Sequence, residues 1–190
     1  MLPRLVLAST SPRRAEILRA VGWPFEVGAA NVDEAMEAQE TAVAYVERLA
    51  RVKAERVAIA RQSEVVLGAD TVVVVDDLVL GKPRDEGDAH RMLRSLSGRW
   101  HDVLTGVALV CVGDKRSVVA HEKTRVRFAA MSNGEINWYV STGESMDKAG
   151  AYAVQGRAAL FIEAIEGDYW NVVGLPVRLV YRLVQQTIER

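Results

Sequence analysis

A hydroxyl-rich turn followed by two arginines stands near the beginning of the chain. The segment Ser9-Thr10-Ser11 follows an apolar run, and Pro12 begins a predicted helix whose first turn holds Arg13 and Arg14. A helix N-terminus already carries partial positive charge and free N–H donors, so arginines placed there favour a bound anion. Phosphate is the first candidate, because the guanidinium group of arginine binds it in a bidentate manner. Two solvated arginines on a surface helix would explain the same residues, and this segment alone does not decide.

A lysine falls on the apolar side of a long predicted helix that runs from Thr41 to about Arg61. The apolar stripe recurs at spacings of three and four residues and consists of Val43, Val46, Ala50, Val57 and Ala60. Lys53 lies in the middle of that stripe. A buried ammonium needs a partner or a route to water. An anionic partner is the favoured interpretation, and a side chain that reaches past a thin part of the core is the alternative.

An aspartate interrupts the most apolar stretch of the chain, residues 64–81. Asp70 has no partner nearby in sequence, so its carboxylate must be paired, bound to a metal or raised in pKa. A structural aspartate bonded to backbone amides is common at turns flanked by glycine. A functional role is favoured here, since Gly68 and Ala69 leave room for a ligand beside it.

Cations and carboxylates together indicate phosphate chemistry. The cations are Arg13, Arg14, Lys53 and Lys82, and the carboxylates are Glu34 and Asp70, with Asp33 and Asp147 as further candidates. A hard divalent cation such as Mg²⁺ binds carboxylates and substrate phosphates together. Hydrolysis of a polyphosphate by an activated water then needs a base, for which Asp70 is the best candidate.

Other phosphate and nucleophile chemistries lack their motifs. Gly81-Lys82 is followed by Pro83 and is no P-loop, and no Gly-x-Gly-x-x-Gly occurs. The single cysteine, Cys111, lies in an apolar run and reads as a buried small side chain. The three histidines are scattered without the spacing of a zinc site.

Composition places the chain among ordinary globular proteins. It has 190 residues, 49% of them apolar and 26% charged, which suits one domain, with two lobes equally compatible. A net charge of −1 and a pI near 6.3 argue against broad nucleic-acid binding. No apolar run is long enough for a membrane span, and the first one is short and interrupted by Arg4, unlike a secretory signal. A reducing cytoplasm fits the single cysteine.

Periodicity and turn signals predict alternating strands and helices. Strands are expected at 4–8, 25–30, 101–112, 117–128 and 158–165, with two more in 64–81 around a turn at Asp76-Asp77. Helices are expected at 12–21, 41–61, 88–96, 132–140 and from Pro176 onward. Ser132 and Glu135 have the spacing of a capping box.

Ordered motifs along almost the whole chain, from near residue 5 to near residue 184, resemble those of the Maf proteins, a family of nucleoside triphosphate pyrophosphatases. They are 9–14 (STSPRR), 68–71 (GADT), 81–84 (GKPR), 96–98 (LSG), 147–152 (DKAGAY), 155–156 (QG) and 171–176 (NVVGLP). The resemblance implies an α/β fold with a mixed, elongated sheet flanked by helices. It also implies one domain, 1–190, with two lobes around a central cleft, as in inosine triphosphate pyrophosphatases.

The resemblance further implies hydrolysis of a nucleoside triphosphate to the monophosphate and pyrophosphate with Mg²⁺ or Mn²⁺. Asp70 then resembles the proton acceptor, and Glu34 and Asp70 the metal ligands. The residues that would bind substrate are Ser9, Arg13, Arg14, Lys53 and Lys82.

Two subtypes of the family differ in base choice, one acting on dTTP and UTP, the other on 7-methyl-GTP. This chain resembles the first, with Thr71 after the aspartate and Gln155 before the glycine; Arg13 is linked to the same choice. A glutamine amide offers one donor and one acceptor to the O4 and N3 edge of uracil or thymine. Two positions depart from the family pattern: Ser145 stands where proline is usual, and Thr10 where glycine is common.

Two alternatives stay open. One is a nucleotide-binding regulator of cell division without turnover, although such a protein could dispense with Asp70 and Glu34. The other is the same enzyme acting on a modified base, with a stacking wall drawn from Trp23, Trp100, Trp138 and Trp170; packing explains each tryptophan equally well. The nucleotide is the expected partner, and a homodimer is a further expectation.

Overall fold

The computed structural model describes residues 2–61, 65–113 and 116–188. The chain divides into two compact units. Unit 1 consists of residues 1–70, 105–122 and 174–190, and unit 2 of residues 71–104 and 123–173. The strands of the described residues form a seven-stranded mixed sheet in the order β2-β1-β3-β5-β6-β7, with β4 paired to β3.

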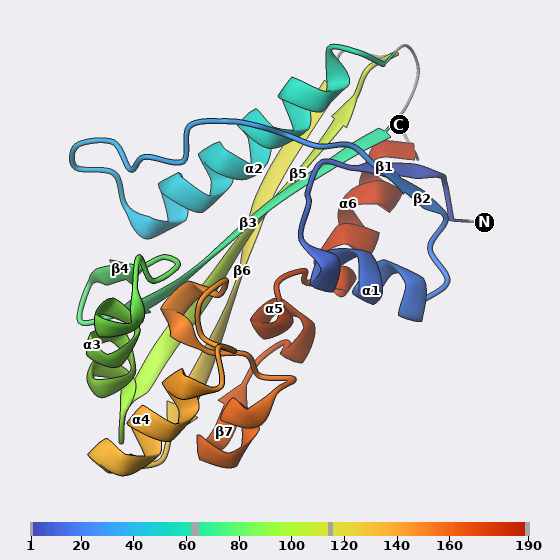
Figure 1. Cartoon of the computed structure of the whole chain (residues 1–190). Coiled ribbons are helices and arrows are strands. Elements are labelled where there is room, and N and C mark those ends of the chain that lie inside the picture. The colour runs from blue at the N-terminus through green and yellow to red at the C-terminus, as the bar shows by residue number, and fades with distance from the viewer. Residues whose placement is uncertain (1, 62–64, 114–115, 189–190) are drawn as a thin grey trace. The chain divides into compact units, whose positions relative to one another are not determined.

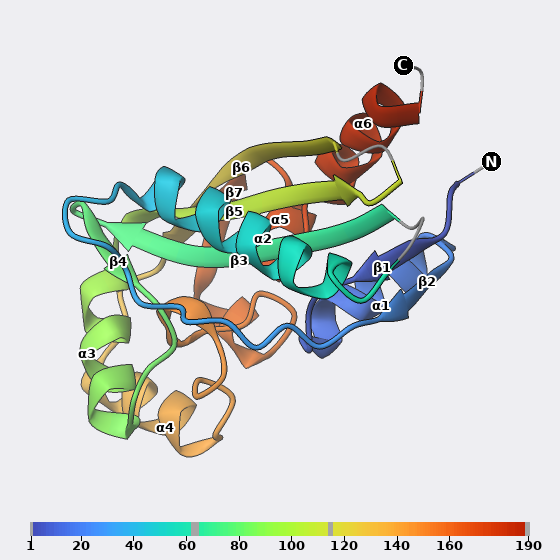
Figure 2. The ribbon, with the colours of Figure 1, turned by 90° about the horizontal axis from the view of Figure 1, so that it is seen from above.

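Unit 1 contains the N-terminal elements and the C-terminal helix. These are β1 (Leu5–Leu7), α1 (Pro12–Ala20), β2 (Phe25–Val27), α2 (Ala42–Ala58) and α6 (Val177–Ile188). Strand β1 pairs in parallel with both β2 and β3. In the core of unit 1, small side chains of α2 pack against those of the strands. They include Val6, Ala8, Ala50, Ala54, Val57, Val66 and Ala108. Helix α2 therefore lies close along the strands, as Figures 1 and 2 both show.

Three long strands contribute residues to both units: β3 (Val65–Val75), β5 (Trp100–Cys111) and β6 (Arg116–Phe128). The expected turn at Asp76-Asp77 is confirmed. Both aspartates have positive φ, 48° and 63°, the conformation of tight hairpin turns, and β3 continues into the antiparallel β4 (Leu78–Leu80).

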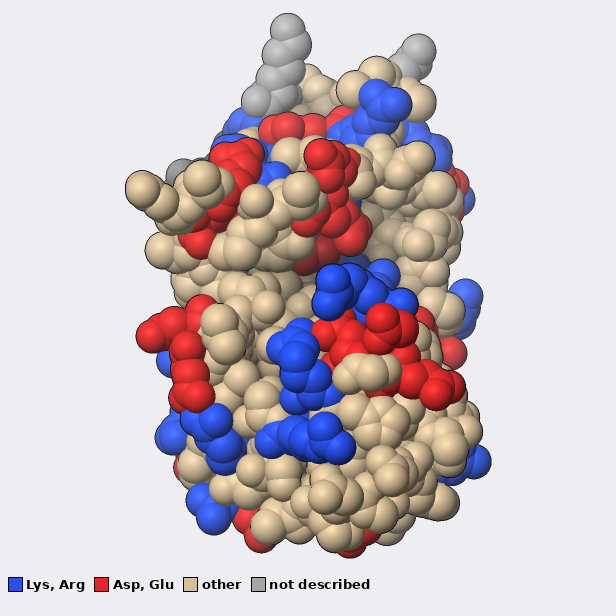
Figure 3. Space-filling view, turned by 60° about the vertical axis from the view of Figure 1, so that its left-hand side comes forward, with Lys and Arg blue, Asp and Glu red and all other residues tan. Residues whose placement is uncertain are grey.

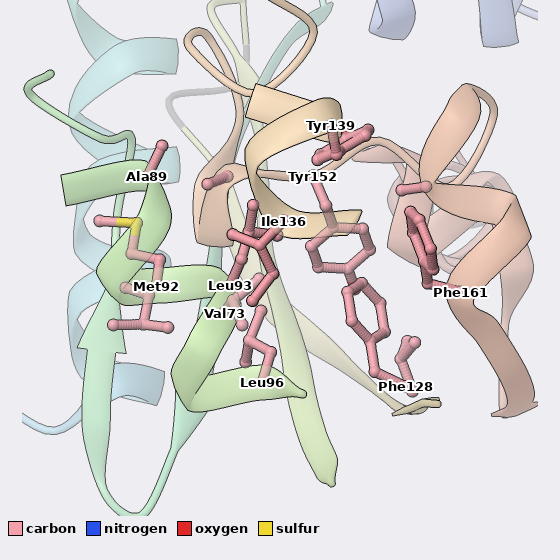
Figure 4. Close-up of a cluster of buried hydrophobic side chains, with 14 of the residues drawn as sticks. Val73, Ala89, Met92, Leu93, Leu96, Phe128, Ile136, Tyr139, Tyr152 and Phe161 are labelled. Atoms are coloured by element: carbon pink, nitrogen blue, oxygen red, sulfur yellow. The ribbon is translucent and has the colours of Figure 1, made fainter. Parts of the chain in front are cut away.

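Unit 2 packs short helices around a second core. Its remaining elements are α3 (Glu86–Leu96), α4 (Asn133–Ser141), the 3₁₀ helices η1 (Ala149–Ala151) and η2 (Arg157–Phe161), β7 (Ile162–Glu166) and α5 (Tyr169–Val173). Helix α3 packs against α4 and η1, and the pair of helices is visible in Figure 2. The core includes Leu93, Phe128, Tyr139, Tyr152 and Phe161, which Figure 4 draws together.

Side-chain caps fix several helix starts. Thr41 accepts from the backbone N–H of Ala44 at 3.2 Å, and Ser132 with Glu135 forms the predicted capping box. Helix α3 begins at Glu86, two residues before the predicted start, because Asp85 caps it by accepting from Asp88 N. Ser11 occupies the predicted N-cap of α1 but makes no side-chain cap; its backbone N–H instead donates to Ser9 Oγ at 3.2 Å.

The predicted strand at 158–165 is wrong in its first half. Residues 157–161 form η2, and only Ile162–Glu166 pairs as β7 with β6. An apolar run of this length does not distinguish a buried 3₁₀ turn from a strand. Helix α2 also ends three residues early, at Ala58, so that Ala60, expected in the buried stripe, is exposed.

The remaining surface and burial features are ordinary. Cys111 is buried, as predicted. Within the described residues, every helix is too short or too polar to cross a membrane. Figure 3 shows acidic and basic side chains next to one another on the face drawn, in keeping with the near-zero net charge.

Candidate active site

Two neighbouring parallel strands carry predicted site residues in unit 1. Strand β1 pairs with β3 so that Leu7 lies opposite Leu67. Ser9 follows the last residue of β1 by two positions. Asp70 lies within β3, three positions after Leu67. The carboxyl end of β1 therefore lies beside the interior of β3, and the carboxyl end of a parallel strand is a common position for ligand sites in α/β sheets. The sequence separates these residues by sixty positions, and the pairing of β1 with β3 brings their strands together.

Glycines let α2 approach the sheet closely enough for Lys53 to reach Asp70. A Cβ at Gly68 would lie 2.0 Å from the backbone oxygen of Ala50, and one at Gly106 would lie 2.1 Å from that of Val46. The helix backbone fills both spaces. The expectation that Gly68 leaves room for a ligand beside Asp70 is therefore wrong, because the backbone of α2 occupies that space. The glycine instead allows the close contact between helix and strand.

Lys53 lies between two carboxylates, which confirms the expected anionic partner. Its Nζ is 2.6 Å from Asp70 Oδ1 and 2.6 Å from Glu34 Oε1. The side chains of Lys53 and Asp70 are 9% and 11% exposed, whereas that of Glu34 is half exposed. The ammonium group offsets the cost of burying the Asp70 charge, and Glu34 connects the buried pair to solvent.

Two residues of α2 hold the loop that carries Glu34. The Tyr45 hydroxyl donates to the backbone oxygen of Glu34 at 2.8 Å. Arg48 donates to both oxygens of Glu40, at 2.6 and 2.8 Å, and to the backbone oxygen of Ala35 at 3.0 Å. The loop is thus bonded to α2 at the backbone of Glu34, at the next residue and at Glu40. Tyr45 and Arg48 were not predictable from the sequence, because nothing in a local pattern links a helix surface to a distant loop.

The charges of this cluster also act on Tyr45 and Arg14. Burial, together with the charges of Asp70 and Glu34, raises the pKa of Tyr45 to about 12. Burial lowers the pKa of the Arg14 guanidinium, the Asp70 and Glu34 carboxylates oppose this, and the neighbouring charge of Arg13 adds to it. Arg14 is therefore within electrostatic reach of both carboxylates and of Arg13.

Arg14 is fixed by hydrogen bonds within unit 1. Its Nε donates to the backbone oxygen of Gly174 at 2.8 Å, and its Nη1 donates to Ser9 Oγ at 3.1 Å. Ser9 and Arg14 are both buried. The turn at Ser9 and the start of α1 are thus joined by hydrogen bonds into one polar group. The charges of Asp70 and Glu34 act on Arg14 of this group.

Three further candidates belong to unit 2, whereas Arg13 is half-buried in α1 of unit 1. Thr71 is half-buried on β3, Lys82 is exposed after β4, and Gln155 is exposed at a turn before η2. Of the two further carboxylate candidates, Asp147 is paired with Lys148, and Asp33 accepts from the backbone N–H of Ala35 at 2.9 Å. Both carboxylates thus bond a group within two residues of their own position.

The donor set of the cluster suits a hard divalent cation. Glu34 and Asp70 supply carboxylate oxygens, the ligands that Mg²⁺ and Mn²⁺ prefer. No group of three or more His, Cys, Asp or Glu side chains arranged for a metal occurs among the described residues. Mg²⁺ is commonly held by one or two carboxylates with waters and substrate phosphates, so the two carboxylates fit such an ion.

The tryptophans have packing roles. Trp23 is buried and donates to the backbone oxygen of Pro3 at 2.9 Å, and Arg125 lies over the ring of Trp100 at 4.5 Å from its centroid. Trp138 packs edge-on against Phe161 in unit 2. Trp170 packs edge-on against Tyr169, so each of the four tryptophans has a packing contact.

Comparison with known proteins identifies the class that this fold and cluster define. The model of the Maf-like protein family matches residues 4–187, and the chain belongs to that family. Solved structures of the Ham1 protein of Staphylococcus aureus and of a HAM1 protein of Coxiella burnetii share the fold. The first has a TM-score of 0.57 at 12% identity over 97% of this chain and 99% of that one, and the second 0.51 at 17% over the whole of both.

Several curated relatives carry the same name, dTTP/UTP pyrophosphatase. The protein of Symbiobacterium thermophilum is 55% identical over 97% of this chain and 94% of its own length. That of Koribacter versatilis is 50% identical over 96% and 93%, and that of Pelotomaculum thermopropionicum 52% over 93% and 92%.

Proposed function

We propose that this chain hydrolyses dTTP and UTP to the nucleoside monophosphate and pyrophosphate. The observation that carries the proposal is the buried pair of Lys53 and Asp70 with Glu34 bonded to the lysine on its exposed side. The common name of relatives at 50–55% identity supports the reaction and the two substrates. The same proposal includes the single domain with two lobes around a cleft, which the resemblance implies. It also includes the cytoplasmic location that the single cysteine favours, and the expected homodimer.

In this proposal Asp70 takes the proton of the attacking water. The water oxygen forms a bond to the α-phosphorus as the bond from this phosphorus to the bridging oxygen breaks, and the bridging oxygen leaves with pyrophosphate. Lys53 keeps the Asp70 carboxylate in place at 2.6 Å. A divalent cation bound by Glu34 and Asp70 supplies charge neutralisation of the phosphates.

Ser9, Arg13, Arg14, Lys53 and Lys82 are proposed to bind the triphosphate. Arg14 is suited to this because Ser9 and the backbone of Gly174 already fix its side chain, so little side-chain entropy is lost on binding. Arg13, Thr71 and Gln155 are proposed to select the base, with the Gln155 amide pairing with the O4 and N3 edge.

The test is pyrophosphate release from a panel of canonical nucleoside triphosphates and 7-methyl-GTP, each with Mg²⁺, Mn²⁺ or a chelator. We expect turnover that needs the metal and favours dTTP and UTP. Asp70→Asn should lower kcat by at least about 100-fold without changing the fold. Asp102→Asn is the matched control, since Asp102 pairs with Lys123 at the surface at 3.2 Å.

Each alternative has its own result in the same assay. Turnover of 7-methyl-GTP in preference to UTP would keep the reaction and overturn the substrate. Binding of nucleotides without turnover would favour the regulator. Full turnover by Asp70→Asn would remove Asp70 from the role of base.

A further inference from the structure

The turn that carries Gln155 lies entirely in unit 2, between η1 and η2. The backbone N–H of Gly156 donates to Ala153 O at 3.1 Å, and that of Ala159 donates to Gly156 O at 3.1 Å. Gln155 itself is exposed at the tip. These bonds shape the turn locally, but they do not fix its place in the molecule.

Two side chains from other segments anchor the turn on both sides of Gln155. The backbone N–H of Ala153 donates to the Tyr139 hydroxyl at 3.2 Å. The Tyr139 hydroxyl donates to Glu144 Oε1 at 2.8 Å, and Glu144 Oε2 accepts from the backbone N–H of Arg157 at 3.0 Å. The four residues form one chain of hydrogen bonds that spans the turn from residue 153 to residue 157.

The Glu144 carboxylate occupies the space that a side chain at Gly156 would need. A Cβ at this position would lie 2.3 Å from Glu144 Oε1 and 2.4 Å from Oε2. The φ of Gly156 is −110°, which other residues adopt freely, so the glycine serves a close approach rather than an unusual conformation. The glycine that follows Gln155 therefore admits the Glu144 carboxylate to the turn.

The anchor itself is rigid and charged. Tyr139 is fully buried and packs edge-on against Phe161 in the aromatic part of the core shown in Figure 4. Burial acts to raise the pKa of Glu144, but the N–H of Arg157 and the hydroxyl of Tyr139 hold it below its usual value. Glu144 is thus an acceptor for both donors at neutral pH.

We propose that Tyr139 and Glu144 are positioning residues for base selection, which hold the Gln155 turn in the position where the Gln155 amide can pair with the edge of a pyrimidine. The inference rests on the proposed function, in which Gln155 reads the base. Hydrogen bonds weaken steeply over a few tenths of an ångström and with misalignment. A turn released from its anchor would therefore pair less well with uracil or thymine, while the contacts to the triphosphate stay as they are.

The test compares Tyr139→Phe and Glu144→Gln with Tyr152→Phe as the matched control. Tyr152 belongs to the same buried cluster, but its hydroxyl lies 2.9 Å from His101 Nε2 and takes no part in the anchor. Each variant is assayed for kcat/KM with UTP, CTP and GTP, and for the inhibition constant of inorganic triphosphate, which has no base.

We expect the two anchor variants to lose at least about fivefold of the preference for UTP over CTP and GTP, mainly through a higher KM for UTP. The inhibition constant of inorganic triphosphate should stay within twofold of the wild-type value, and Tyr152→Phe should keep the wild-type preference. The ratio of two kcat/KM values does not depend on the fraction of active enzyme, so partial misfolding of a variant does not obscure the result. Gly156→Ala, which pushes the carboxylate away from the turn, should cause the same loss.

Proportional loss on all three nucleotides, or an unchanged preference in the anchor variants, would overturn the inference and leave the pair a structural role. Absence of turnover by the wild-type protein would instead refute the proposed function. The two failures are thus distinguished in one set of measurements.

Discussion

Lys53 Nζ lies 2.6 Å from Asp70 Oδ1, and both side chains are almost completely buried. The lysine comes from the middle of α2 and the aspartate from β3, and the glycines at 68 and 106 allow helix and strand to meet. The ammonium group thus compensates the buried carboxylate charge inside unit 1. The same lysine bonds Glu34 on its exposed side, so a cation or a phosphate that enters the cluster meets charges already arranged for it.

Lys53→Met should destabilise the metal-free protein by about 3 kcal/mol, because the buried Asp70 charge loses its partner. Urea unfolding at pH 7.5 measures the change. Added Mg²⁺ should recover part of the loss, since a divalent cation between the carboxylates replaces the missing positive charge. Wild-type stability in the variant without metal would show that the pair contributes nothing to the fold.

Arg48→Ala should raise the Mg²⁺ concentration needed for half-maximal activity by about threefold to tenfold. The variant removes the bonds from α2 to Glu40 and Ala35, and the loop that carries Glu34 becomes freer. Titration of activity with Mg²⁺ at saturating UTP measures the shift.

The control for Arg48→Ala is Arg4→Ala, which removes an arginine that pairs with Glu26 at the surface at 2.9 Å. This variant should keep the wild-type metal requirement, because surface pairs contribute little. Equal metal requirements in both variants would mean that Glu34 keeps its place without Arg48.

The sequence pointed to Lys53 and Asp70 because each breaks an apolar pattern, and a buried charge needs a partner wherever it occurs. It did not pair the two with each other. That pairing depends on the register of β1 with β3 and on the distance of α2 from the sheet, which are tertiary features. The role of Gly68 was misjudged for the same reason, since an absent side chain does not show what occupies its space.

The helices were predictable where a cap or an amphipathic stripe marks them. Leu179, Val180, Leu183 and Val184 of α6 are buried as their spacing predicts. The segment from 143 to 161 was not, because its shape depends on side chains such as Tyr139 and Glu144 that bond backbone groups more than ten residues away. Periodicity carries no record of such bonds.

The stability of the protein should fall between pH 6.5 and pH 4 through His101. Burial lowers the pKa of this histidine to about 4, against an unfolded value of 6.5. Below pH 6.5 the unfolded chain binds a proton that the folded protein does not, so stability is complete above this pH and decreases by about 1.4 kcal/mol per pH unit below it. Denaturant unfolding across this range measures the slope. His101→Gln, which does not titrate, should flatten it; an equal slope in both proteins would assign the effect to other groups.

Ser145→Ala should stabilise the protein by about 1 kcal/mol, or about 2–4 °C in Tm. Ser145 is fully buried, and its hydroxyl is one of the few buried side-chain groups in the described part of the chain without a hydrogen-bond partner. An apolar residue fits at this position, because the surroundings offer the hydroxyl nothing to bond. Thermal unfolding followed by circular dichroism measures the change. Ser95→Ala is the control: the Ser95 hydroxyl donates to Met92 O at 2.7 Å, so its removal should lower Tm. A lower Tm for Ser145→Ala than for the wild type would show that the hydroxyl is bonded after all, for instance through a buried water.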